Sequence, residues 1–157
     1  MHQHFSPRSL ALGGLSAAAY VALTLMFAPI SFAQIQFRIS EALTLLPVLS
    51  PAFVPGLFIG CLAANLVTGQ PWQDVVFGSL ASLVAALLTR RFRHTLWLAA
   101  LMPVAINALV IGLMLYWAYG LHPYISFLAV GAGQAVVCFG LGVPLVRLLQ
   151  QRQLPLA

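Results

Sequence analysis

The feature that most constrains this fold is a series of long apolar runs that carry almost no charge. The clearest run, residues 96–119, contains no Asp, Glu, Lys or Arg. About 20 consecutive apolar residues are enough for an α-helix to span the ~30 Å hydrocarbon core of a bilayer. The chain of 157 residues is 62% hydrophobic and only 6% charged, whereas a soluble domain carries about 25% charged residues. The sequence therefore predicts an integral membrane protein.

The apolar runs and the turn residues between them predict an all-α bundle of six transmembrane helices. We expect one membrane domain over residues 1–157, because no linker or repeat divides the chain. The predicted helices lie at approximately 10–31, 41–50, 53–68, 74–89, 96–119 and 124–149. The first run is longer than the 7–15-residue apolar region of a signal peptide, so we expect it to remain as a span. The second and third helices are short, and a re-entrant pair is the alternative.

The basic residues predict the orientation of the bundle. All seven of them are arginines, and six spans place both termini on the same side of the membrane. With that side in the cytoplasm, six arginines are inside and only Arg38 is outside; the six are Arg8, Arg90, Arg91, Arg93, Arg147 and Arg152. This bias agrees with the positive-inside rule. We therefore predict cytoplasmic termini and a multi-pass protein of the cell membrane. Nucleic acid is not an expected partner, because the arginines form no patch interleaved with aromatic residues.

A stretch around residues 36–47 carries the charges that are hardest to place. Glu41 is one of two acidic residues in the chain, and Arg38 is the basic residue that the topology places outside. A charge within the membrane costs about 2.5–3.5 kcal/mol on insertion scales, so such groups are usually paired, hydrated or functional. We interpret this stretch as one wall of a small-molecule site. Neutralisation of Glu41 by Arg38, as a structural pair, is the alternative.

Few other polar side chains lie within or near the predicted spans, and the topology places them at similar depth in the outer half of the bundle. The candidate substrate-binding residues are Glu41, Asn65, Asn107, Gln134, Asp74, Arg38 and Trp72. A few convergent polar groups in an apolar cleft are typical of a ligand site. The alternatives are that single amides only link helices and that Asp74 only caps its helix.

Signals for enzymatic chemistry are missing from the sequence. The chain has no lysine with which to complete a phosphate-binding P-loop. Cys61 and Cys138 lie inside apolar runs without metal-ligand spacing, and buried cysteine commonly behaves as a small hydrophobic residue. We therefore expect no catalytic residues, no metal site and no cofactor in this chain.

Small residues recur at four-residue spacing in the first run, at Gly14, Ala18 and Ala22. Such a stripe lets another helix approach closely. It predicts either packing inside this bundle or docking to another membrane subunit. Gly56 and Gly60 form a second stripe of this kind.

Five segments together resemble one known family, the queuosine-precursor transporters. They are residues 41–47 (EALTLLP), 54–61 (VPGLFIGC), 64–66 (ANL), 74–80 (DVVFGSL) and 103–109 (PVAINAL). The resemblance runs from about residue 10 to residue 149. Members of this family are substrate-binding (S) components of energy-coupling-factor transporters.

The resemblance implies a six-helix S-component fold and a 7-deazaguanine-type queuosine precursor held on the outer side. The implied partners are a transmembrane coupling subunit and two cytoplasmic ATPase subunits, which would use the ATP. The first helix of S components commonly docks on the coupling subunit through an Ala-x-x-x-Ala stripe, which matches Ala18 and Ala22. Glu41, Asn65 and Asn107 match polar positions of the family pattern.

One position departs from the family pattern. Many relatives have Gly-x-Gly-Glu-Ala in the last helix, where this chain has residues 131–135 (GAGQA), with Gln134 in place of the carboxylate. A missing carboxylate removes a partner for an aminomethyl cation, so the departure favours a neutral, nitrile-bearing precursor or a different substrate.

Overall fold

The computed structural model describes residues 6–28 and 37–152, and this part of the chain contains helices and turns but no strand. The elements are α1 (Pro7–Met26), η1 (Ile39–Val48), α3 (Phe53–Val67), η2 (Asp74–Gly78), α4 (Ser79–Arg91), α5 (Leu96–Tyr119), α6 (Pro123–Val137), η3 (Cys138–Gly142) and α7 (Val143–Gln151). Since η2 continues into α4, and α6 continues through η3 into α7, the described elements form six helical rods. The predicted all-α bundle is confirmed.

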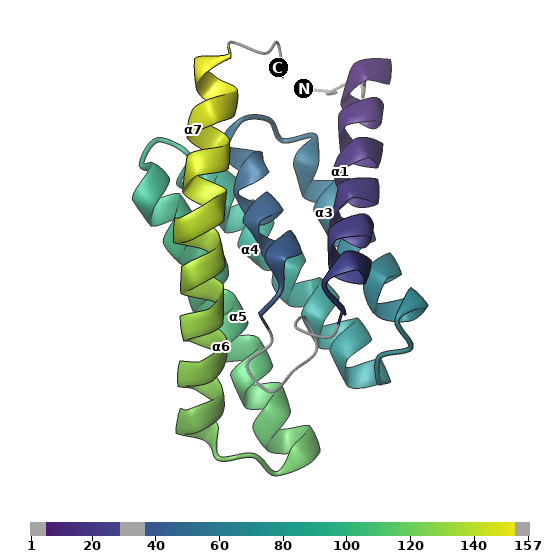
Figure 1. The fold of residues 1–157 in the computed structure, drawn as a ribbon, viewed down its shortest axis with the longest axis vertical. Coiled ribbons are helices and arrows are strands. Elements are labelled where there is room, and N and C mark those ends of the chain that lie inside the picture. Colours follow the sequence, from purple (N-terminus) through teal and green to yellow (C-terminus); the bar gives the residue numbers. More distant parts are fainter. Residues whose placement is uncertain (1–5, 29–36, 153–157) are drawn as a thin grey trace.

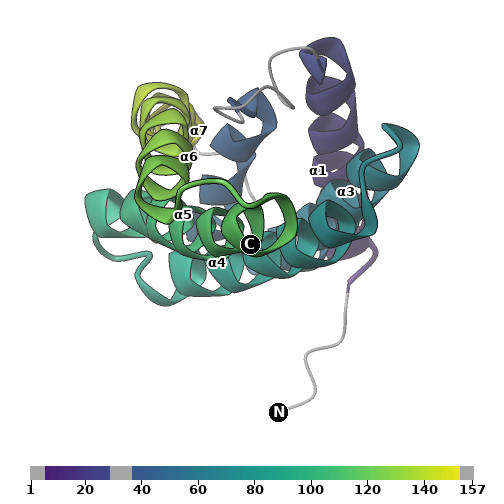
Figure 2. The same cartoon turned by 90° about the horizontal axis from the view of Figure 1, so that it is seen from below.

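The rods surround η1, which contacts every other rod of the described bundle. Figure 2 shows η1 in the middle, with α1 and α3 on one side, α6 and α7 on the other, and α4 and α5 closing a third side. The beginning of α1 and the end of α7 lie at one end of the bundle, whereas the turn from α5 to α6 lies at the other (Figure 1). The beginning and the end of the described chain therefore lie at the same end of the bundle, as an even number of spans requires.

Three of the described helices are long and apolar enough to cross a membrane, namely Pro7–Met26, Leu96–Tyr119 and the continuous rod Pro123–Gln151. The first was predicted to extend to residue 31. It ends at Met26, and residues 29–31 lie outside the described residues. The predicted third and fifth helices agree with α3 and α5 to within one residue at each end. The protein is therefore a multi-pass membrane protein.

The second rod differs in kind from the α-helix predicted at residues 41–50. It is a 3₁₀-helix over Ile39–Val48, with Pro47 inside it. With a rise of about 2.0 Å per residue, it is roughly 20 Å long, which is shorter than the ~30 Å hydrocarbon core. Residues 40–48 are all buried, so η1 is a core element wrapped by the other helices.

Glycines on α3 bring α1 unusually close. A methyl group added at Gly56 would lie less than 3.0 Å from Ser16 Oγ and from the Gly13 backbone, and one at Gly60 would meet Ala17 and Tyr20. The predicted stripe of Gly56 and Gly60 is thus an internal packing surface.

The stripe predicted on α1 has a different environment. Gly14, Ala18 and Ala22 are all exposed, and a methyl group added at Gly14 would meet no atom within 4 Å. These three residues therefore do not pack against another helix of the described bundle, which was one of the two alternatives for this stripe. They lie on the outer surface of the membrane domain.

Candidate functional site

Glu41 lies in the first turn of η1 and is buried, with 2% of its surface exposed. Its Oε1 accepts a hydrogen bond from the Tyr20 hydroxyl of α1 at 2.5 Å. Tyr20 itself is completely buried. A buried carboxylate is strongly destabilising unless hydrogen bonds and opposite charge compensate for its lost hydration, so this hydrogen bond is one reason why Glu41 can occupy the core.

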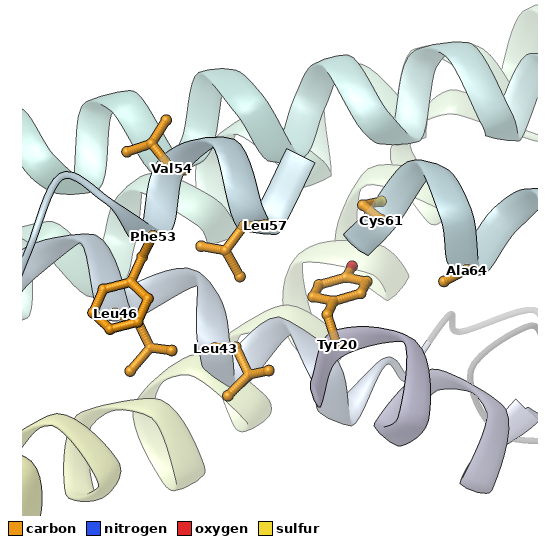
Figure 3. Close-up of a cluster of buried hydrophobic side chains, with 9 residues drawn as sticks. Tyr20, Leu43, Leu46, Phe53, Val54, Leu57, Cys61 and Ala64 are labelled. Atoms are coloured by element: carbon orange, nitrogen blue, oxygen red, sulfur yellow. The ribbon is translucent and has the colours of Figure 1, made fainter. Parts of the chain in front are cut away.

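Tyr20 is a site residue that the sequence analysis missed. It projects from α1 toward Cys61 of α3, within a cluster of buried apolar side chains (Figure 3). One turn further along α1, the hydroxyl groups of Thr24 and Ser40 are hydrogen-bonded to each other at 2.8 Å. Both contacts join α1 to the first turn of η1. The only signal in the sequence was the presence of hydroxyl groups inside an apolar run, which does not distinguish such residues from ordinary packing.

Arg38 immediately precedes η1, and it is buried as well. Its Nη1 lies 4.0 Å from Cys61 Sγ and close to Gly78, where an added methyl group would be 3.9 Å from that nitrogen. The guanidinium interacts electrostatically with both Glu41 and Asp74. Arg38 therefore lies where its positive charge is near both carboxylates, from two different elements.

Asn65 and Asp74 form the second part of the site. The Asn65 Nδ2 donates to the backbone carbonyl of Asp74 at 3.1 Å, and both side chains are buried. The Asp74 Oδ2 accepts a hydrogen bond from the Tyr119 hydroxyl at 3.2 Å. Asp74 lies in the π-helical turn η2. The alternative role considered for Asp74, that it only caps its helix, does not explain why its carboxylate is buried and hydrogen-bonded to Tyr119 of α5.

Asn107 and Gln134 approach Glu41 from α5 and α6. Asn107 is buried, and its amide lies near the Glu41 carboxylate without the geometry of a hydrogen bond. Gln134 is joined to η1 through Cys138, whose thiol lies 3.7 Å from the Gln134 Oε1 and 3.9 Å from the Glu41 backbone carbonyl. The structure thus brings six of the seven predicted residues into one connected buried cluster, the polar cluster: Arg38, Glu41, Asn65, Asp74, Asn107 and Gln134.

Trp72, the seventh predicted residue, lies on the surface outside the polar cluster. Its side chain is 59% exposed, and its ring packs edge-to-face on Trp117 at 6.3 Å. Trp117 also contacts Phe77. Exposed tryptophans near helix ends are typical of the membrane–water interface.

Both π-helical segments border the polar cluster. η2 contains Asp74 and ends at Gly78, beside Asn65 and Arg38. η3 contains Cys138 and ends at Gly142, where an added methyl group would lie 3.1 Å from the carbonyl oxygen of Ala42 in η1. Short π-helical turns within α-helices occur frequently at functional sites. Their position here supports the interpretation of the polar cluster as the functional site.

Three buried atoms of the polar cluster have no hydrogen-bond partner among the described residues: Glu41 Oε2, Asn65 Oδ1 and Asn107 Nδ2. Buried polar groups are nearly always hydrogen-bonded, so each exception needs an explanation. Two are acceptors and one is a donor. This set can bind a small molecule that presents complementary groups.

Two apolar cavities bordered by described residues lie away from the polar cluster. One of about 310 Å³ lies between α5 and α6 and is bordered by Leu109 and Phe127. The other, of about 160 Å³, lies between α1 and α3 beside Gly13 and Gly56. Within the described residues, no group of three or more His, Cys, Asp or Glu side chains could hold a metal ion.

A helical membrane bundle that encloses charged and amide side chains is typical of membrane proteins that bind or transport a small polar solute. A comparison with models of known families identifies the family. The QueT transporter family model matches residues 10–151, so this chain belongs to the QueT transporter family. It is a multi-pass protein of the cell membrane.

Among individual proteins, the chain is similar to the "Queuosine precursor transporter QueT" of Lactococcus lactis subsp. cremoris. The two are 36% identical over 84 residues, which cover 50% of this chain and 49% of the relative. The aligned part therefore spans about half the length of that protein. No solved structure matches this chain.

Proposed function

We propose that this protein is the membrane-embedded substrate-binding component of an ATP-driven uptake transporter, and that it binds a queuosine precursor of the 7-deazaguanine type. Membership of the QueT transporter family and the name of the Lactococcus relative support the substrate class. The resemblance of residues 41–80 to S components supports the mode of transport. Six residues of the polar cluster provide the binding site.

The observation that carries the proposal is the set of three unpaired buried atoms in the polar cluster. A guanine-type ring presents an exocyclic amino group as donor and a carbonyl oxygen as acceptor. Glu41 Oε2 and Asn65 Oδ1 can accept from the amino and ring N–H groups, while Asn107 Nδ2 can donate to the carbonyl oxygen. The ligand thus supplies two hydrogen-bond donors for the two unpaired acceptor oxygens and one acceptor for the unpaired amide nitrogen.

The charges of the polar cluster bear on which precursor is preferred. Arg38 interacts with the Glu41 and Asp74 carboxylates, and Gln134 adds no charge. Because many relatives of the S-component type carry a glutamate at the position of Gln134, this chain lacks one partner for an aminomethyl cation. We therefore expect it to prefer a neutral, nitrile-bearing precursor.

A binding titration tests the substrate proposal. Purified protein in detergent, without ATP, is titrated with 7-cyano- and 7-aminomethyl-7-deazaguanine, and with adenine as a ligand of similar size whose hydrogen-bonding edge is different. Binding of a deazaguanine, weakened at least tenfold in the Asn65→Ala and Asn107→Ala variants, supports the proposal. No binding of either deazaguanine, or equal binding of adenine, contradicts it.

The proposed partners are a transmembrane coupling subunit and two cytoplasmic ATPase subunits. The exposed stripe of Gly14, Ala18 and Ala22 supports docking through α1, because small residues allow a second helix to approach closely. We expect Ala18→Leu to abolish co-purification of a coupling subunit while ligand binding persists. Ala132→Leu, at an exposed position on α6, is the matched control.

The alternative to ATP-driven transport is a solitary carrier that works without ATPase partners. Uptake of labelled precursor in a host that lacks any such ATPase distinguishes the two. The proposal predicts that uptake in this host falls to the background level. Undiminished uptake there contradicts the ATP-driven mode but leaves the substrate proposal intact.

A further inference from the structure

Tyr20 combines a buried, tightly packed ring with a hydroxyl group that makes a hydrogen bond in the polar cluster. Its ring belongs to the buried apolar cluster with Leu43 and Leu57, and none of its surface is exposed. Figure 3 shows the ring between α1 and α3, with the hydroxyl directed away from α1. The surrounding side chains therefore fix where the hydroxyl group lies. That hydroxyl donates to Oε1 of Glu41.

The position of Glu41 is constrained from the same helix by a second contact. Thr24 lies one turn beyond Tyr20, and its hydroxyl bonds to the Ser40 hydroxyl of η1 as well as to the Tyr20 carbonyl oxygen. Ser40 directly precedes Glu41. The two hydroxyl contacts hold the first turn of η1 against α1, and only one of them reaches the carboxylate.

The two oxygens of Glu41 therefore differ. Oε1 is occupied by Tyr20, whereas Oε2 is buried and makes no hydrogen bond within the described residues. Carboxylates bind ligands tightly when their orientation is fixed beforehand, since hydrogen bonds to charged groups are strong but directional. We propose that Tyr20 is a positioning residue of the site: by holding Oε1 of Glu41, it presents Oε2 to a hydrogen-bond donor of the ligand. This inference rests on the function proposed above.

A double-mutant cycle on ligand binding tests this inference. We expect Tyr20→Phe to raise the Kd for the preferred deazaguanine about tenfold, the loss of roughly one hydrogen bond to a charged group. In the Glu41→Gln background, the same substitution is expected to change Kd less than threefold, because coupled residues are not additive. A Tyr20 that only supports packing would give the same factor in both backgrounds. Tyr124→Phe, at an exposed tyrosine of α6, is the control and should leave Kd unchanged.

An infrared measurement on the protein without ligand provides the second readout. The chain has two acidic residues, so subtraction of the Glu41→Gln spectrum isolates the Glu41 carboxyl band. We expect Tyr20→Phe to shift that band and Tyr124→Phe to leave it in place. An unshifted band overturns the proposal. Unchanged Kd in Tyr20→Phe, while Glu41→Gln weakens binding, also overturns it and leaves the proposed function standing.

A third outcome is that the wild-type protein binds neither deazaguanine, and the infrared measurement separates this outcome from the two above. A shifted carboxyl band without any binding would confirm that Tyr20 bonds to Glu41, but it would refute both the proposed function and the role of Oε2 toward this ligand. Binding together with a shifted band and a non-additive cycle supports the proposal in full.

Discussion

The close packing of α1 on α3 gives the sharpest prediction about stability. Gly56→Ala would place a methyl group less than 3.0 Å from Ser16 Oγ and from the carbonyl carbon and oxygen of Gly13. Two of these three atoms belong to the backbone, so rotation of a side chain cannot relieve the clash and α1 has to move. Overpacking of this kind typically costs 1–3 kcal/mol. We expect about 2–3 kcal/mol of lost unfolding free energy.

The control for this substitution lies on the helix that faces Gly56. Gly14→Ala meets no atom within 4 Å, and alanine is more favourable than glycine in a helix interior by roughly 0.5–1 kcal/mol. The two glycine substitutions are therefore expected to change the unfolding free energy with opposite signs. Helix propensity alone would give both the same sign.

Equilibrium unfolding in detergent measures the difference. Three tryptophans give a fluorescence signal, and far-ultraviolet circular dichroism follows the loss of helix. Because α1 also carries Tyr20, Gly56→Ala should weaken deazaguanine binding as well. A Gly56→Ala protein as stable as Gly14→Ala would refute the description of how α1 and α3 pack.

Three further outcomes are expected. Arg90 donates to the carbonyl oxygens of Pro47 and Val48 at the end of η1, so Arg90→Ala should lower the unfolding free energy by about 1–2 kcal/mol; the exposed Arg91→Ala should change it by less than about 0.5 kcal/mol. Thr24→Val leaves the buried Ser40 hydroxyl without its hydrogen-bond partner, and we expect a loss of about 1–3 kcal/mol in the same unfolding assay. Gln134→Glu should shift the ratio of Kd values toward 7-aminomethyl-7-deazaguanine in competition binding; an unchanged ratio would show that Gln134 does not set this preference.

The general architecture could be predicted from the sequence because hydropathy and turn residues are enough to locate membrane helices. The run at 96–119 became α5 without a change of boundary, since Gly120 ends it in a left-handed conformation with φ of 66°. The kind of helix could not be predicted in the same way. In η1 the residues from Ser40 to Val48 are all buried, so no polar face reveals whether the helical period is three or 3.6 residues.

The π-helical turns have a similar explanation. η2 and η3 interrupt runs that are apolar on most sides, and a single extra residue per turn leaves no trace in such a pattern. Their positions depend on close contacts between elements far apart in the sequence. One example is Gly142, which faces the Ala42 carbonyl oxygen of η1.

The candidate site could be predicted in part, because charged and amide side chains are rare in this chain and therefore conspicuous. Arg38 and Glu41 were found on that basis, and the structure places them with Asn65 and Asn107. Tyr20 was not found, because an aromatic residue within an apolar run fits packing as well as polar contact. Only the fold shows that its hydroxyl reaches Glu41.

The central claim is that the polar cluster receives a deazaguanine through its unfilled atoms. A structure of the protein with bound 7-cyano-7-deazaguanine tests it most directly. We predict a ligand donor at about 2.7–3.2 Å from Glu41 Oε2, with Asn65 and Asn107 bonded to the same ring. A ligand bound instead in the apolar cavity beside Leu109 and Phe127, with no contact to the polar cluster, would contradict it.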